Sequence, residues 1–161
     1  MKKIAIIAAL LMVFSVGSVF AVGIGVQGGY VAGNAGYGSG AVTFKLDSPW
    51  IFAVNADLYG NSWGVGLTMD NWIGNPVIEK PFRFFYGWGL AGSVALWETG
   101  TELFVGARAV AGLNCFVLDN VLEFYLQAAW QPGIVIGLHD NGGVLPSLWN
   151  FPLNAGFRFW F

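Results

Sequence analysis

The feature that most constrains this chain is an alternation of apolar residues with polar or small ones, which recurs in short segments from Val22 onward. The clearest case is the last segment, where the alternating apolar positions are Leu153, Ala155, Phe157, Phe159 and Phe161. Successive side chains of a β-strand point to opposite faces, so this segment has one oily face and one face that holds Arg158. Almost all of the remaining segments repeat the pattern, so the chain has more apolar strand surface than a single core can bury.

The composition indicates that water is not the only solvent of this chain. Of its 161 residues, 56% are apolar and only 10% are charged, far from the balance of an average soluble protein. No internal stretch reaches the roughly 18 unbroken apolar residues of a membrane-spanning helix, because Gly and polar residues interrupt every run. We therefore expect one domain that uses no helical span beyond its N-terminus.

The N-terminus has the residue order of a secretory signal peptide. Lys2 and Lys3 precede an apolar run over residues 4–14, and small and apolar residues lead up to Ala21. We expect residues 1–21 to be a signal peptide and residues 22–161 to be the exported domain. The alternative is an uncleaved anchor helix, for which the apolar run is short.

The cysteine and charge content narrow the class further. Cys115 is the only cysteine, so the exported chain has no internal disulfide and no lipid-anchor cysteine at the cleavage site. After removal of residues 1–21, the chain has five basic and nine acidic side chains, which gives a net side-chain charge of −4. No basic patch indicates nucleic acid as a partner.

From Val22 the sequence divides into about eight β-prone segments separated by Gly, Asn, Asp and Pro clusters. They cover residues 22–32, 39–47, 50–60, 62–73, 82–93, 102–117, 121–136 and 152–161. Two tight connections test this division, because directly opposed residues of an antiparallel pair share a face. The loop at residues 47–49 would oppose Phe44 with Phe52, and the turn at residues 119–120 would oppose Cys115 with Phe124. Both hairpins match apolar with apolar.

The same alternation of side chains along each segment places the charged residues on the face opposite the apolar one. They are Lys45, Asp70, Arg83, Arg108, Glu123 and Arg158, and seven glycines fall on that face with them: Gly64, Gly66, Gly87, Gly89, Gly106, Gly112 and Gly156. Small residues suit a narrow interior. An antiparallel sheet with one apolar and one polar face, closed so that no edge is unpaired, can cross a bilayer.

We therefore predict an all-β fold, an eight-stranded antiparallel up-and-down transmembrane β-barrel. The rival is a soluble, lipocalin-like barrel with its apolar face inside, but an exterior has no need of seven glycines. Short turns at residues 47–49 and 119–120 would face the periplasm with both termini, and the longest outer loop would be 138–150. Aromatic residues fall near both rims, as they do at the two membrane interfaces.

The signal peptide, the alternating strands and the Phe157, Phe159, Phe161 ending resemble the small eight-stranded outer-membrane barrels, the group of the OmpA transmembrane domain, OmpX and OmpW. This resemblance implies the outer membrane of a diderm bacterium, with outer-membrane lipid and lipopolysaccharide as neighbours. It also implies that Leu153, Phe157, Phe159 and Phe161 form the signal read by the outer-membrane assembly machinery. The resemblance covers the architecture of residues 22–161 and identifies no activity.

The charges on the polar face have two interpretations, a gate or selectivity ring, or a closed network that plugs the lumen. We expect Asp70 and Arg83 to lie at similar depth on adjacent strands, as Glu123 and Arg158 would, with Lys45 near the same rim. An eight-stranded interior is only wide enough to be filled by side chains, so we favour the plug.

The sole histidine lies in the outer-loop sequence His139, Asp140, Asn141. This weakly resembles the lipid A deacylase family, in which a nucleophilic Ser stands two positions after a His base. Here that position is Asn141, which cannot attack an ester, and nothing in the sequence brings Ser147 to His139. We therefore predict no catalytic residue and no enzyme. We also expect no cofactor and no metal site, because Cys115 has no clustered ligand partner.

The function that the sequence favours is that of a non-catalytic outer-membrane barrel with a plugged polar lumen, serving envelope integrity or binding a surface ligand through its loops. The first alternative is a narrow channel for small solutes, similar to OmpW. Its expected apolar lumen conflicts with the charges predicted here. The second alternative is a lipid A deacylase-like enzyme that lacks its nucleophile.

Overall fold

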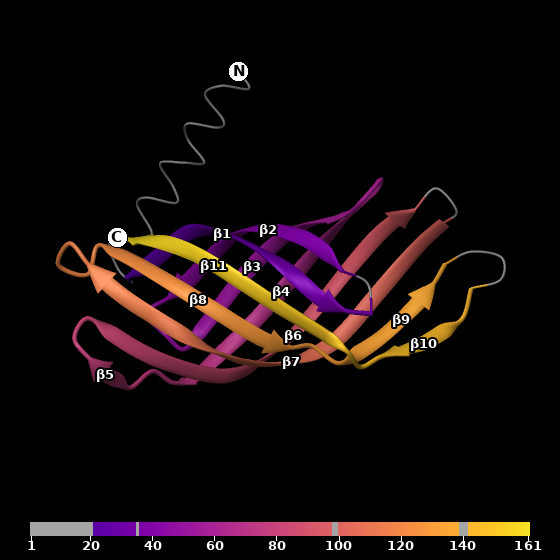
Figure 1. Ribbon diagram of the computed structural model, residues 1–161. Coiled ribbons are helices and arrows are strands. Elements are labelled where there is room, and N and C mark those ends of the chain that lie inside the picture. The colour runs from indigo at the N-terminus through magenta and orange to yellow at the C-terminus, as the bar shows by residue number, and fades with distance from the viewer. Residues whose placement is uncertain (1–20, 35, 98–99, 139–141) are drawn as a thin grey trace, which may run out of the picture.

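The computed structural model describes residues 21–34, 36–97, 100–138 and 142–161, which form strands joined by short connections (Figure 1). The strands are β1 Val22–Gly33, β2 Tyr37–Leu46, β3 Trp50–Tyr59, β4 Ser62–Gly74, β5 Val77–Glu79, β6 Phe82–Trp97, β7 Gly100–Val117, β8 Leu122–Trp130, β9 Gly133–Gly137, β10 Val144–Ser147 and β11 Asn150–Trp160. Within these described ranges no helix is both long and apolar enough to cross a membrane. The expected signal peptide lies, up to residue 20, outside the described residues.

Eight of these strands close into a barrel. The ladder runs β11, β1, β2, β3, β4, β6, β7, β8 and returns from β8 to β11, and every pairing is antiparallel. Among these eight strands, neighbours in the barrel also follow one another along the chain, apart from the pair of the first and last strands, β1 and β11. The prediction of an eight-stranded antiparallel up-and-down barrel is therefore confirmed.

Both hairpin registers predicted from the sequence are present. Phe44 stands opposite Phe52 across the loop at residues 47–49, and Cys115 stands opposite Phe124 across the second turn. In that turn Asp119 and Asn120 both have positive φ, 55° and 71°. Positive φ at both central residues gives the turn the twist of its flanking strands, and Asp and Asn tolerate this conformation well.

The end of the barrel that carries these two turns also carries the beginning of β1 and the end of β11, and we call it the turn end (Figure 1). The opposite end is the loop end. β6 and β7 extend further toward the loop end than the predicted segments 82–93 and 102–117, because their ladder continues to the pair Trp97 and Gly100.

The predicted seventh segment, 121–136, is two strands rather than one. β8 ends at Trp130 and β9 starts at Gly133, since Pro132 has no N–H for the ladder and the chain changes partner there. Gln131 N still donates to Asn150 on β11, whereas the Pro132 carbonyl accepts from Ala107 on β7. Beyond this point β9 pairs with β7 and β10, so part of the expected loop 138–150 is strand.

The faces of the sheet are divided as the alternation predicts. Apolar side chains such as Leu67 and Leu126, 62% and 59% exposed, point outward at mid-strand. Polar side chains such as Thr43, Glu123 and Arg158 point inward and are fully buried. A soluble barrel would need the reverse arrangement, so the lipocalin-like alternative is wrong.

Candidate functional site

The lumen holds two groups of bonded polar side chains. The first, which we call the turn-end layer, consists of Thr43, Lys45, Asn114, Glu123 and Arg158. The second, the central layer, consists of Asp70, Arg108, Gln127 and Gln131. All nine side chains are buried. A buried charge is costly unless it is paired and hydrogen-bonded, so the pairing inside each layer decides whether the lumen is stable.

Glu123 is the centre of the turn-end layer. It forms ion pairs with Lys45 Nζ at 3.0 Å and with Arg158 Nη1 at 3.3 Å. Asn114 Nδ2 and Trp160 Nε1 also donate to its carboxylate, at 2.8 and 3.1 Å. Four donors from three strands, β2, β7 and β11, therefore meet on one carboxylate of β8, which ties the four strands together across the lumen.

Aromatic rings complete this layer. The Arg158 guanidinium lies 3.9 Å from the ring centroid of Tyr125, and Lys45 Nζ lies 4.0 Å from that of Trp72. Trp72 in turn stacks on Phe85, with ring centroids 3.6 Å apart and planes 7° from parallel. Cations over ring faces are attracted by the ring quadrupole, more so where water is excluded. The two cations of the layer are thus held by rings as well as by Glu123.

Two glycines leave the space that these rings occupy. A Cβ at Gly156 would lie 2.6 Å from Tyr125 Cζ, and a Cβ at Gly112 would overlap the Phe85 ring. Both glycines were expected on the lumen face for their small size. Their partners show the reason, since each glycine faces an inward aromatic side chain.

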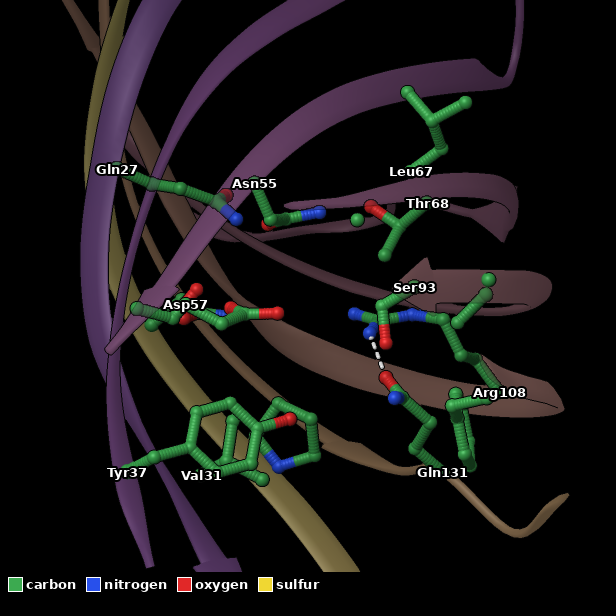
Figure 2. Close-up of a pocket in the computed structure, with 17 residues that line it drawn as sticks. Gln27, Val31, Tyr37, Asn55, Asp57, Leu67, Thr68, Ser93, Arg108 and Gln131 are labelled. Carbon is green, nitrogen blue, oxygen red and sulfur yellow. Dashed lines mark hydrogen bonds between the residues drawn. The ribbon is translucent and has the colours of Figure 1, made fainter. Parts of the chain in front are cut away.

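The central layer is organised around Asp70. Arg108 Nε donates to Asp70 Oδ1 at 2.8 Å, and Gln127 Nε2 donates to Oδ2 at 2.9 Å. The other side of the Arg108 guanidinium donates to the Gln131 side-chain oxygen (Figure 2). This layer joins β4, β7 and β8 and continues to Gln131, where the chain leaves β8.

One expected pairing is wrong. Asp70 does not lie beside Arg83, because Asp70 stands opposite Gly89 on β6, and its ion pair is with Arg108. Arg83 pairs instead with Val77 on β5, six residues along β6 from Gly89, so it lies near the turn end. There its guanidinium lies 5.2 Å from the ring centroid of Phe116.

The structure brings Lys45, Glu123 and Arg158 together, and Asp70 with Arg108. Strand parity in the sequence placed Gln127 on the polar face, and Gln127 lies in the central layer. The sequence did not single out Trp72, Phe85 and Gln131, which complete the two layers. Trp72 shares strand parity with Asp70, and this signal alone would have placed it in the lumen.

The free space in the lumen is uneven. Among the described residues, Thr43, Phe85, Asn114, Glu123 and Arg158 are at most 2% exposed, and they fill the turn-end half. Toward the loop end a cavity of about 30 Å³ remains, room for a few water molecules at most, into which Asp57 points (Figure 2). A wider cavity of about 280 Å³ follows at the loop end.

The remaining candidate residues lie away from the lumen layers. Leu153, Phe157, Phe159 and Phe161 all point outward, from 37% to 55% exposed. His139, Asp140 and Asn141 lie outside the described residues. Cys115 carries a free, half-buried thiol, and the described residues contain no cluster of His, Cys, Asp and Glu that could hold a metal ion.

Comparison with known proteins supports the fold and goes no further. No protein-family model and no curated protein sequence matches this chain. Among solved structures, it is similar to the N-terminal β-barrel domain of OprF from Pseudomonas aeruginosa, at 16% identity and a TM-score of 0.53. It is also similar to Neisserial surface protein A, at 15% identity and a TM-score of 0.50. Each match covers 88% of this chain and 97% of the other chain. The chain has the fold of the eight-stranded outer-membrane barrels.

Proposed function

We propose that this protein is a non-catalytic integral outer-membrane barrel with a plugged lumen, which contributes to envelope integrity and presents its loop end to lipopolysaccharide or another surface ligand. The observation that carries the proposal is the turn-end layer, in which Thr43, Glu123 and Arg158 have no exposed surface. An eight-stranded barrel is just wide enough for side chains to fill it. Glu123 accepts from four donors, and Arg158 contacts Glu123, Thr43 and the Tyr125 ring, so these contacts hold both charged side chains across the lumen.

The outer surface supports a place in the membrane. Its outward side chains are apolar around the barrel, and large aromatic residues occur toward both ends. At the turn end these are Trp50, Phe82 and Phe161, and at the loop end Trp63, Trp130 and Trp149. Aromatic belts of this kind lie at the two membrane interfaces. Lipid is therefore the neighbour that this surface suits.

Single-channel recording on refolded protein in planar bilayers tests the plug. We expect no discrete conductance steps from the wild-type protein, because an ion crossing the lumen would have to displace Arg158 and Glu123 together. Repeated steps of one amplitude, absent from bilayers without protein, would refute the plug. They would favour a narrow channel for small solutes, which the two cavities at the loop end would serve as an entrance.

A lipid A deacylase-like activity is the other function to test. Ser147 is 7% exposed, and its hydroxyl oxygen accepts hydrogen bonds from Asn150 Nδ2 at 2.7 Å and Asn34 Nδ2 at 3.5 Å. A hydroxyl held in this way serves the structure of the loop end, so we assign Ser147 no nucleophilic role. Incubation of the refolded protein with lipid A should release no fatty acid. Release that a Ser147→Ala variant abolishes would contradict the non-catalytic proposal.

A further inference from the structure

The cavity of about 280 Å³ at the loop end lies beyond the two polar layers and is not needed for the plug. Its volume is close to the lower limit for small-molecule sites, which are typically about 300 to 1,000 Å³. It adjoins the smaller cavity above the central layer, since Tyr37, Ser93, Phe104 and Gln131 line both. The two cavities are therefore adjacent, and we call them together the recess, which lies between the loop end and the central layer.

Aromatic side chains form a large part of the wall of this recess. Tyr37 and Tyr59 lie side by side on β2 and β3, with ring centroids 4.3 Å apart. Trp97 on β6 continues the row, with its ring centroid 5.1 Å from that of Tyr59. Phe104 on β7 lines the recess as well. Faces of such rings attract cations and bind apolar groups.

Two carboxylates lie among these rings. Asp57 on β3 is 6% exposed and points into the recess, as Figure 2 shows. Its partner across the ladder is Ser39, a neutral hydroxyl that cannot cancel the charge. Glu102 on β7 lines the wider part and accepts a hydrogen bond of 3.0 Å from Trp97 Nε1.

No described basic side chain neutralises either carboxylate by an ion pair. Arg108 lines the inner part of the recess, but Asp70 and Gln131 already hold its guanidinium. The recess therefore combines aromatic walls with two acidic groups that have no cation of their own.

We propose that this recess binds a small organic cation, a quaternary or protonated amine on a short apolar body, from the outer side of the membrane. The ammonium group would lie among the Tyr37, Tyr59 and Trp97 rings with Asp57 below it, and the apolar body would contact Phe104. The site needs only the loop-end recess, so it is independent of whether the lumen conducts.

The test uses choline and its neutral carbon analogue, 3,3-dimethylbutan-1-ol, which share a shape and differ in charge. Isothermal titration of each into the refolded full barrel, in a maltoside detergent free of choline headgroups, measures the two affinities. We expect saturable choline binding with one site per barrel, and binding of the neutral analogue at least about tenfold weaker.

Variants locate the site. Asp57→Asn and Glu102→Gln keep side-chain shape and remove one charge each, and Asp57→Asn should weaken choline binding by about tenfold or more. The matched control is Asp47→Asn in the exposed loop at residues 47–49, which should leave the affinity unchanged. If a variant fails to fold, the comparison of choline with its neutral analogue on the wild-type protein still tests whether the site prefers a cation.

Three results would overturn the proposal. The first is the absence of saturable choline binding up to tens of millimolar, and the second is equal affinity for the neutral analogue. The third is choline binding that survives both carboxylate substitutions in folded protein. Single-channel recording on the same preparation is a separate measurement, so failure of the plug and failure of the cation site are distinguishable.

Discussion

Arg158 on β11 stands directly opposite Glu123 on β8, and the two side chains meet inside the barrel with 3.3 Å between Arg158 Nη1 and Glu123 Oε2. Both are fully buried. Such a pair stabilises the fold less than its Coulomb attraction suggests, because both charges have left water, but removing one partner leaves the other uncompensated. The pair therefore fixes how β8 and β11 close, and it makes each partner costly to remove.

Replacing Arg158 with Ala should destabilise the barrel by about 3 to 5 kcal/mol without opening a pore. The reason is that Glu123 keeps only Lys45 as a cationic partner, while Phe85 and Asn114 still fill the lumen. Urea titration of protein refolded into vesicles measures the loss, and planar-bilayer recording measures the conductance.

Arg83→Ala is the control for this change. Arg83 also lies at the turn end, but it forms no ion pair with a described residue and only faces the Phe116 ring. Its removal should cost about 1 kcal/mol or less. Equal losses of unfolding free energy from the two variants would mean that the ion pair with Glu123 contributes no extra stability. Conductance from the Arg158→Ala variant would refute the plug.

Lys45 and Glu123 should be energetically coupled. A double-mutant cycle with Lys45→Met and Glu123→Gln, followed by urea unfolding, should give a coupling free energy of about 0.5 to 3 kcal/mol. The control cycle pairs Lys45→Met with Glu102→Gln at the loop end, where additivity within about 0.5 kcal/mol is expected. Strict additivity in the first cycle would show that the 3.0 Å contact contributes nothing.

The sequence predicted the barrel and its two faces because both follow from a local rule. Side-chain direction in a strand has a period of two residues, so Phe44 with Phe52 and Cys115 with Phe124 could be matched across short turns without knowledge of the rest. Glu123 and Arg158 also face each other, because β8 and β11 are joined in the ladder at that point.

Pairing across the lumen depends on the stagger of the whole barrel and could not be predicted in the same way. Asp70 and Arg108 lie on β4 and β7, which are not neighbours in the ladder. Arg83 lies apart from Asp70 because the ladder continues past Trp72 and adds β5, where Arg83 pairs with Val77, whereas the sequence predicted only a connection at residues 74–81. The acidic recess was missed for a similar reason, since Asp57 on β3 and Glu102 on β7 come from strands that are not neighbours in the ladder.

Gly112 should tolerate no side chain. A Cβ at this position would overlap the backbone carbonyl of Leu126 and the Phe85 ring, which is itself stacked on Trp72. Gly112→Ala should therefore cost about 1 to 3 kcal/mol, the range for overpacking a filled interior. Gly38→Ala is the control, because nothing lies within 4 Å of the added atom, and it should change stability by about 0.5 kcal/mol or less. Equal unfolding midpoints would show that the lumen adjusts freely.

A charge on the outer face should be costly only where lipid surrounds it. Leu67 is 62% exposed near the middle of β4, and Leu67→Arg should destabilise the barrel in vesicles by about 2 to 4 kcal/mol. Leu118 is 69% exposed in the turn before β8, outside the strands, and Leu118→Arg should cost about 1 kcal/mol or less. A larger cost at Leu118 than at Leu67 would place the apolar band elsewhere.

Phe161 should act on assembly more than on stability. Its backbone pairs with Val22, with N to O distances of 3.1 and 3.3 Å, whereas its side chain is 55% exposed on the outer face. Phe161→Ala keeps the backbone pairing, so the refolded protein should unfold at nearly the wild-type urea concentration.

In cells, the fraction of barrel that is protected from protease in the outer membrane should fall at least about twofold, if the terminal aromatic is the signal that the assembly machinery reads. Phe151→Ala, an outward aromatic at the other end of β11, is the matched control, because it removes a similar side chain without touching the chain end. Similar assembly of the two variants would remove Phe161 from the signal.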